Sequence, residues 1–293
     1  MNRLYPDDFI ALSYHNSESE KKHDPMEVMP GSDYPSNITG FPSAWLDRTY
    51  QVDAYGGFDA SSNQMGIDKA WKAVSGLLAE ANIDVKAELN ADKTAVEAKA
   101  YVNFPLEINN ARYGVEFVLV ADGLKGTADG WTQKNYYAKG KNGTDFSEPE
   151  FEQFIKADGN VSGLVFDDVA VATTRLTGEN QYMPETIEED KVYELPATFK
   201  LAKVKNTSGE NIVQNADNLR VVAVLIDYND GTVVNAAKTL RMGEATGIKG
   251  LDADEDSTPV AIYDLSGRRL NSLQQGLNIV KTANGRTSKI IVK

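Results

Sequence analysis

The chain has 293 residues, which at roughly 150 residues per domain indicates about two domains. Its 43 acidic residues outnumber its 30 basic residues, and the net charge of −13 argues against nucleic acid or an anionic membrane surface as a partner. The absence of cysteine excludes disulfides, thiolate metal sites and a cysteine nucleophile within this chain, and two histidines are few for metal sites or acid–base triads.

The first region, residues 1–81, mixes short strands with helices. Strands are expected at Phe9–Tyr14, Ala44–Asp47 and Tyr50–Ala54, and a short helix at Tyr34–Thr39. The strongest helical pattern covers Ile67–Ala81, where apolar residues recur at three- and four-residue spacing. One face of this helix is expected to be buried: Ile67, Ala70, Trp71, Val74, Leu77, Leu78 and Ala81.

The order of these elements resembles the later part of a thioredoxin fold. The resemblance rests on FIALSY, a polar excursion, a short helix and then ITGFPS (Ile38–Ser43) leading into a strand. It implies a cis peptide bond before Pro42, and a groove for extended peptides lined by Phe41, Pro42 and Trp45; core packing of these three is the alternative. The first strand and the CxxC helix of that fold are missing, so the expected domain is incomplete.

The second region, residues 82–242, is mostly β. Ile83–Leu89 and Val96–Val102 alternate between apolar and polar residues, which predicts a hairpin with one solvated face. Asn229-Asp230-Gly231 predicts the turn of a second hairpin. Further strands are expected at Tyr113–Ala121, Leu164–Thr174, Val192–Leu201, Arg220–Asp227 and Thr232–Ala236, and a helix at Pro149–Lys156. Many short strands favour a sandwich or barrel, so the predicted fold class is α+β with a β-sandwich-like domain.

Candidate ligand-binding residues are aromatic. Trp131, Tyr136 and Tyr137 lie in a long polar stretch, where exposed rings could stack on a sugar or a protein partner, although interior packing is favoured about twofold. His15, His23 and Asp24 share one loop region and could in principle hold a divalent metal, but solvated side chains are favoured. The paired acids Asp167 and Asp168 are also expected to be solvated. The sequence predicts no catalytic residue, metal site or cofactor.

The third region opens with an acidic linker, residues 243–259, and closes with a small β segment, residues 260–293. VAIYDLSGRRL (Val260–Leu270) and GLNIVKTANGRTSKIIVK (Gly276–Lys293) resemble two motifs of the sorting domain that the type IX (Por) export system recognises. The resemblance implies a sorting role for Tyr263, Asp264, Gly267, Arg268, Gly276 and Lys293, with the export machinery as partner. The alternative is that the strands at 260–265, 277–281 and 288–292 pair with an edge of the sandwich.

A thioredoxin-like part followed by a β domain resembles the twenty-eight-kilodalton outer-membrane protein family of Gram-negative anaerobes. Asp24-Pro25-Met26 before the Gly-Phe-Pro motif, and LRVVAVLIDYNDGTVVNAA, carry this likeness. It implies a non-catalytic binding or adhesin-like protein at the outer membrane, cell surface or outside the cell, whose partner is a surface protein, peptide or glycan. The alternative is a thiol–disulfide oxidoreductase whose CxxC lies upstream of Met1. No stretch approaches the ~20 apolar residues of a membrane helix. Residues 1–9 lack the apolar core of a signal peptide, which is expected to precede the present start.

Overall fold

The computed structural model forms two compact units, residues 1–245 and residues 246–293. The four predicted parts have boundaries at residues 81, 242 and 259, whereas the structure divides the chain once, between Ala245 and Thr246. The residues that the structure describes are 1–2, 4–6, 8–17, 23–29, 33–34, 38, 41–52, 66–140, 149–245, 259–263, 269–270, 272, 274, 276–282 and 287–292.

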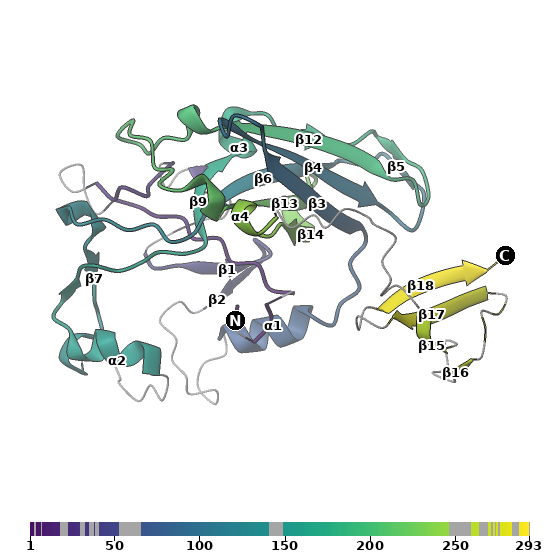
Figure 1. The fold of residues 1–293 in the computed structure, drawn as a ribbon, viewed down its shortest axis with the longest axis horizontal. Coiled ribbons are helices and arrows are strands. Elements are labelled where there is room, and N and C mark those ends of the chain that lie inside the picture. The colour runs from purple at the N-terminus through teal and green to yellow at the C-terminus, as the bar shows by residue number, and fades with distance from the viewer. Residues whose placement is uncertain are drawn as a thin grey trace. The chain divides into compact units, whose positions relative to one another are not determined.

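The larger unit contains two antiparallel sheets packed face to face (Figure 1). The three-stranded sheet has the order β12 (Tyr193–Lys200), β4 (Ala95–Asn103), β3 (Asn82–Leu89). The five-stranded sheet has the order β10 (Gln181–Tyr182), β6 (Tyr113–Ala121), β13 (Leu219–Asp227), β14 (Thr232–Lys238), and β9 (Val169–Thr173) also pairs with β6.

The predicted hairpins form with the register that the alternating pattern requires. Ile83 lies opposite Val102 in the β3–β4 pair, and Val85 lies opposite Ala100. The β13–β14 hairpin turns at the predicted position, where Gly231 has a φ of 81° and its N–H donates to the Asp227 carbonyl. Such a positive φ favours glycine because a Cβ atom would be strained there.

Strands β6 and β13 are buried on both faces. Val115, Phe117 and Leu119 face the three-stranded sheet, as do Val221 and its alternating neighbours on β13. The opposite face forms a second apolar cluster of Val118, Val120, Ala170, Val222, Val224 and Ile226. Full burial stabilises each such aliphatic side chain by about 1.5–3 kcal/mol, so both faces need cover. This double burial explains why Val221–Ile226 is continuously apolar instead of alternating.

The N-terminal segment covers the second face of β6 and β13, although it is not the predicted strand. Ile10, Leu12 and Tyr14 pack against the second cluster. The segment forms a single parallel bridge, in which the N–H of Ser13 donates to the Asp168 carbonyl (2.7 Å) and the Ser13 carbonyl accepts from the N–H of Ala170 (2.9 Å). Because this segment shares a core with β6 and β13, residues 1–81 do not separate from the β sheets.

The remaining elements of residues 1–81 are shorter than expected. Strands β1 (Ala44–Leu46) and β2 (Tyr50–Val52) pair only with each other, and the predicted cis Phe41–Pro42 bond is present. Helix α1 covers Ile67–Val74, so the prediction of a helix to Ala81 was wrong: Leu77 and Leu78 are 69% and 98% exposed. The short helix expected at residues 34–39 falls mostly outside the described residues.

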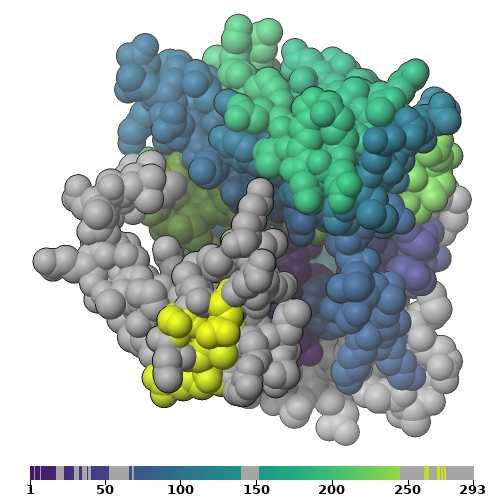
Figure 2. Space-filling view, turned by 90° about the vertical axis from the view of Figure 1, so that its right-hand side faces the viewer, coloured from purple at the N-terminus to yellow at the C-terminus, as the bar shows by residue number. Residues whose placement is uncertain are grey.

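Short elements complete the larger unit. The predicted helix at Pro149–Lys156 forms as α2, whereas the strand expected at Leu164–Thr174 shortens to β9 and continues into helix α3 (Thr174–Thr177). Strand β5 (Ile108–Asn109) pairs with β11 (Thr186–Ile187), and β7 (Gln133–Lys134) pairs with β8 (Asn160–Val161). Helix α4 covers Met242–Ala245. Figure 2 views the end of the larger unit where the segments around β5 and β11, far apart in sequence, lie side by side.

The smaller unit is one antiparallel sheet with the order β16 (Arg269–Leu270), β15 (Pro259–Tyr263), β17 (Gly276–Thr282), β18 (Thr287–Val292). The three predicted strands are present, and β16 is an addition. Where the structure describes them, these strands pair with one another in a single sheet. Tyr263 pairs with Arg269 and Ile279, and Gly276 pairs with Val292. The other predicted sorting residues, Asp264, Gly267, Arg268 and Lys293, lie outside the described residues.

Candidate functional site

A large groove opens on the larger unit, with a volume of about 1740 Å³. Its floor is formed by β13 and β14, and its walls by the N-terminal segment, the β1–β2 hairpin, α1 with the residues that follow it, and residues 130–137. Pockets for drug-sized ligands have volumes of roughly 300–1,000 Å³. The groove is therefore large enough for an extended ligand.

Five of the six predicted ligand-binding residues line this one groove. Phe41, Pro42 and Trp45 lie on one wall, and Tyr136 and Tyr137 on another, although about ninety residues separate the two groups in the sequence. The tertiary fold thus brings together two candidate sites that no feature of the sequence connects.

Trp131, the sixth candidate, does not line the groove. Its ring packs against Phe166 at 6.1 Å between ring centroids, with an angle of 47° between the ring planes. Gly126 approaches it so closely that an added Cβ would lie 2.3 Å from the indole Nε1 atom. Trp131 therefore packs against other side chains of the protein, which was the alternative to ligand binding.

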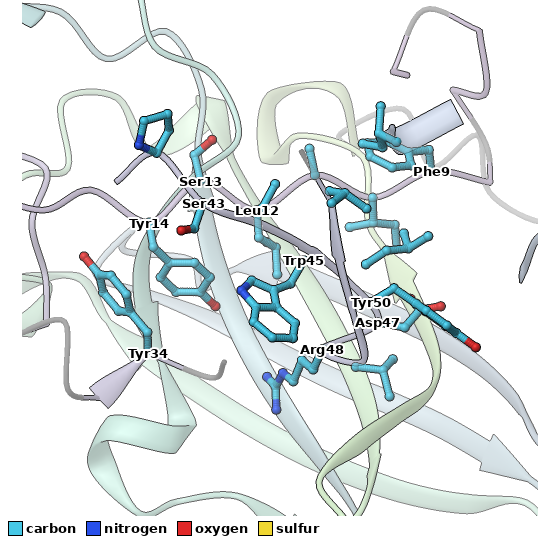
Figure 3. Close-up of a pocket in the computed structure, with 18 of the residues that line it drawn as sticks. Phe9, Leu12, Ser13, Tyr14, Tyr34, Ser43, Trp45, Asp47, Arg48 and Tyr50 are labelled. Carbon is cyan, nitrogen blue, oxygen red and sulfur yellow. The ribbon is translucent and has the colours of Figure 1, made fainter. Parts of the chain in front are cut away.

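Several aromatic rings are partly exposed along the groove. Phe41, Tyr50 and Tyr136 have exposed fractions of 49%, 47% and 50%. Figure 3 shows Tyr50 among the lining side chains. The indole nitrogen of Trp45 is buried and has no hydrogen-bond partner among the described residues. A buried donor without an acceptor costs about 1–3 kcal/mol, so this N–H lowers the stability of the hairpin that carries it.

Tyr14 and Tyr34 form the polar part of one wall. Their ring centroids are 5.8 Å apart, and the Tyr34 hydroxyl donates to the carbonyl of His15 at 2.6 Å. Burial raises the pKa of Tyr14 to about 12, so its hydroxyl is uncharged at neutral pH and offers a neutral donor or acceptor beside the groove (Figure 3).

A buried ion pair positions the β1–β2 hairpin. Arg48 lies in the turn between the strands, where it and Asp47 have positive φ values of 59° and 51°. Its guanidinium donates to the carboxylate of Glu116 on β6, and the two side chains are 12% and 1% exposed. Arg175 provides a second cation 3.5 Å from the other carboxylate oxygen. The Arg48–Glu116 pair therefore holds the hairpin, and with it Trp45, against the sheet.

Sequence reasoning missed this pair. Glu116 is the charged residue within YGVEFVLVA, a strand in which every residue is buried. A carboxylate in such a strand requires a cation or several donors, because burying an isolated charge is prohibitively costly. That signal could have identified Glu116, but it could not have identified Arg48 as the partner.

His15 is not the solvated side chain that we expected. Its Nδ1 atom lies 3.0 Å from Asp24 Oδ2, its side chain is 15% exposed, and its ring packs edge-on against Phe166. Gln133 donates to the same carboxylate oxygen at 3.2 Å. This contact joins the N-terminal segment to the wall at residues 130–137. His23 is exposed, and in the described part of the chain no group of three or more His, Asp or Glu residues is placed to hold a metal ion.

Asp167 is exposed, as expected, whereas Asp168 is partly buried in an ion pair. Asp168 accepts from Arg220, and Asp167 accepts from the N–H of Gly123 at 2.8 Å. Arg220 and Arg241 both donate to Asp122, whose side chain is 3% exposed. These ion pairs fasten the loops at one end of the five-stranded sheet, which is a structural role.

Comparisons with known proteins give only distant likenesses. No family model and no curated protein matches this chain. The structure of HBP35 of Porphyromonas gingivalis matches with 13% identity and a TM-score of 0.42, over 88% of this chain and 78% of that one. A domain of the outer membrane lipoprotein Omp28 from the same organism matches with 15% identity and a TM-score of 0.26, over 56% of this chain and 88% of that one. At these TM-scores neither likeness fixes the fold or the function of this chain.

Proposed function

We propose that this chain is a non-catalytic, cell-surface or outer-membrane-associated binding protein. The observation that supports a binding role is the groove, in which exposed aromatic rings from separate segments face a cavity larger than an ordinary small-molecule pocket. Exposed aromatic side chains contribute large contact areas and dominate many recognition surfaces. The surface location rests on the outer-membrane family resemblance of the sequence and on the sorting motifs.

The binding role can be tested with arrays of peptides and oligosaccharides. We expect the full chain to bind a subset of them, and the double variant Tyr50→Ala/Tyr136→Ala to lose that binding, because both rings are about half exposed in the groove. Tyr182→Ala is the matched control, since Tyr182 is 65% exposed and lies outside the groove lining. Binding that survives in the double variant, or that is lost equally in the control, would refute a role for the groove.

The C-terminal unit is proposed to be an export signal. The compactness of residues 246–293 supports this role, because a receptor must be able to recognise the signal on folded cargo. In a host with type IX export machinery, we expect the full chain at the cell surface and a deletion of residues 246–293 to stay inside the cell with an unchanged melting temperature. A deletion variant that still reaches the surface would contradict the proposal. Among the described residues, no helix is long and apolar enough to span a membrane.

A further inference from the structure

One end of the groove gathers carboxylates from three separate elements. Asp47 comes from the β1–β2 turn, Glu80 from the connection between α1 and β3, and Asp227 and Asp230 from the end of β13 and its turn. Tyr113 lies among them: its hydroxyl donates to Glu80 at 3.3 Å. Asp227 lies opposite Tyr113 in the β6–β13 pair. Burial, Glu80, Asp227 and Asp230, in that order of importance, raise the pKa of Tyr113 to about 12.

These carboxylates lack cationic partners. Among the described residues, Asp47, Glu80, Asp227 and Asp230 form no ion pair, and the Asp227 and Asp230 side chains accept only from groups of their own turn. Among the described residues, the lysine and arginine residues that line the groove are Arg48 and Lys134, against six Asp and Glu residues. Arg48 is already paired with the buried Glu116. The groove is therefore negatively charged, with the excess concentrated at this end.

The spacing of the carboxylates favours several separated positive charges over one metal ion. No group of three acidic or histidine side chains among the described residues is close enough to hold a metal. The groove is also lined by partly exposed apolar side chains such as Ile10, Leu12 and Val233. A ligand that matches this surface carries ammonium or guanidinium groups along a chain that also has apolar side chains.

We propose that the groove binds an extended basic polypeptide segment, an inference that rests on the proposed binding function. Lysine or arginine side chains of that segment would lie at Asp47, Glu80, Asp227 and Asp230. The partly exposed aromatic rings of the groove contribute stacking and cation–π contacts. Tyr50 lies beside Asp47, where its ring can contact a cation bound by that carboxylate (Figure 3). Charge complementarity disfavours anionic ligands in the same groove.

The test uses a fluorescein-labelled decapeptide in which four lysines alternate with leucine and alanine, and a second peptide with glutamate in place of lysine. Fluorescence anisotropy with the full chain is expected to show saturable binding of the basic peptide only, weakened when NaCl rises from 50 to 300 mM. The groove variant is Asp47→Asn/Glu80→Gln/Asp227→Asn/Asp230→Asn, in which asparagine keeps the side-chain acceptor of each turn. Because exposed charge pairs are individually weak, the four changes together are expected to reduce affinity by about tenfold or more.

The control variant changes four exposed carboxylates outside the groove by the same total charge: Glu88→Gln, Glu97→Gln, Glu107→Gln and Glu189→Gln. It is expected to keep the affinity of the native chain within about twofold, because screened charges at a distance contribute little. Equal loss in both variants would reduce the effect to net charge and overturn the proposal, as would no binding of the basic peptide. If a neutral oligosaccharide binds and depends on Tyr50 and Tyr136 while the basic peptide does not, the proposed binding function stands and this ligand class is wrong.

Discussion

Replacing Arg48 tests whether one ion pair positions the groove wall. The Arg48→Met variant keeps most of the side-chain volume but leaves Glu116, 1% exposed, without its main cation. Breaking a buried ion pair from one side costs about 3–5 kcal/mol, because the remaining charge stays desolvated. Arg175 lies 3.5 Å from the second carboxylate oxygen and can compensate in part, so we expect a loss near the lower limit, about 3 kcal/mol.

The measurement is urea unfolding of the full chain followed by tryptophan fluorescence, because Trp45 is carried by the hairpin that Arg48 holds. For a unit of about this size, a loss of 1 kcal/mol in the free energy of unfolding lowers the melting temperature by roughly 2–4 °C. The melting temperature of the variant should therefore fall by about 6–12 °C. In the double variant Arg48→Met/Glu116→Leu the stranded carboxylate is gone, and most of the lost stability should return. This role of Arg48 would be refuted if the free energy of unfolding of Arg48→Met lay within about 0.5 kcal/mol of that of the native chain, or if the double variant were less stable than the single one.

Three further predictions concern packing and pH. Gly126→Ala should destabilise the fold by about 1–3 kcal/mol because its Cβ would overlap Trp131, whereas Gly159→Ala, with open space around it, should leave the melting temperature unchanged. Leu78→Ser should alter the free energy of unfolding by no more than about 0.5 kcal/mol, since Leu78 is 98% exposed; a large loss would show that α1 continues through it. Burial raises the pKa of Tyr14 and Tyr228 to about 12, above the ordinary value of 10, so their contribution to stability is complete below pH 10 and is lost between pH 10 and 12. Spectrophotometric titration at 295 nm should show tyrosines ionising late, and titration of every tyrosine near pH 10 would contradict this prediction.

The local sequence pattern predicted correctly those elements whose contacts lie between residues close together in the chain. The alternation of Ile83–Leu89 and Val96–Val102, with a short turn between them, fixes both the hairpin and its inward face. The Asn229-Asp230-Gly231 turn does the same for β13 and β14, and the amphipathic pattern of α2 gave its limits correctly. The three predicted strands of the C-terminal unit formed for the same reason.

Tertiary contacts determined features that sequence periodicity did not predict, namely the end of α1 and the conformation of the N-terminal segment. Leu77 and Leu78 fit a helical stripe in sequence, yet both are exposed among the described residues, and α1 ends at Val74, just before Ser75 and Gly76. Phe9–Tyr14 has the composition of a strand, but its apolar side chains cover the face of β6 and β13 while its main chain makes only one bridge. In both cases the outcome depends on which distant surface is available, and a short apolar run carries no such information.

The candidate site belongs almost entirely to the tertiary structure. The sequence identified Trp45 and Tyr136 as aromatic candidates, but only folding brought their segments to one groove. Sequence reasoning did not single out Glu116, and its partner Arg48 is 68 residues away, in a turn that no local pattern distinguishes. Local alternation and turn residues determine strands and hairpins because neighbouring residues enforce them. The groove and its ion pair form where segments distant in sequence come into contact, and those contacts are determined by long-range packing.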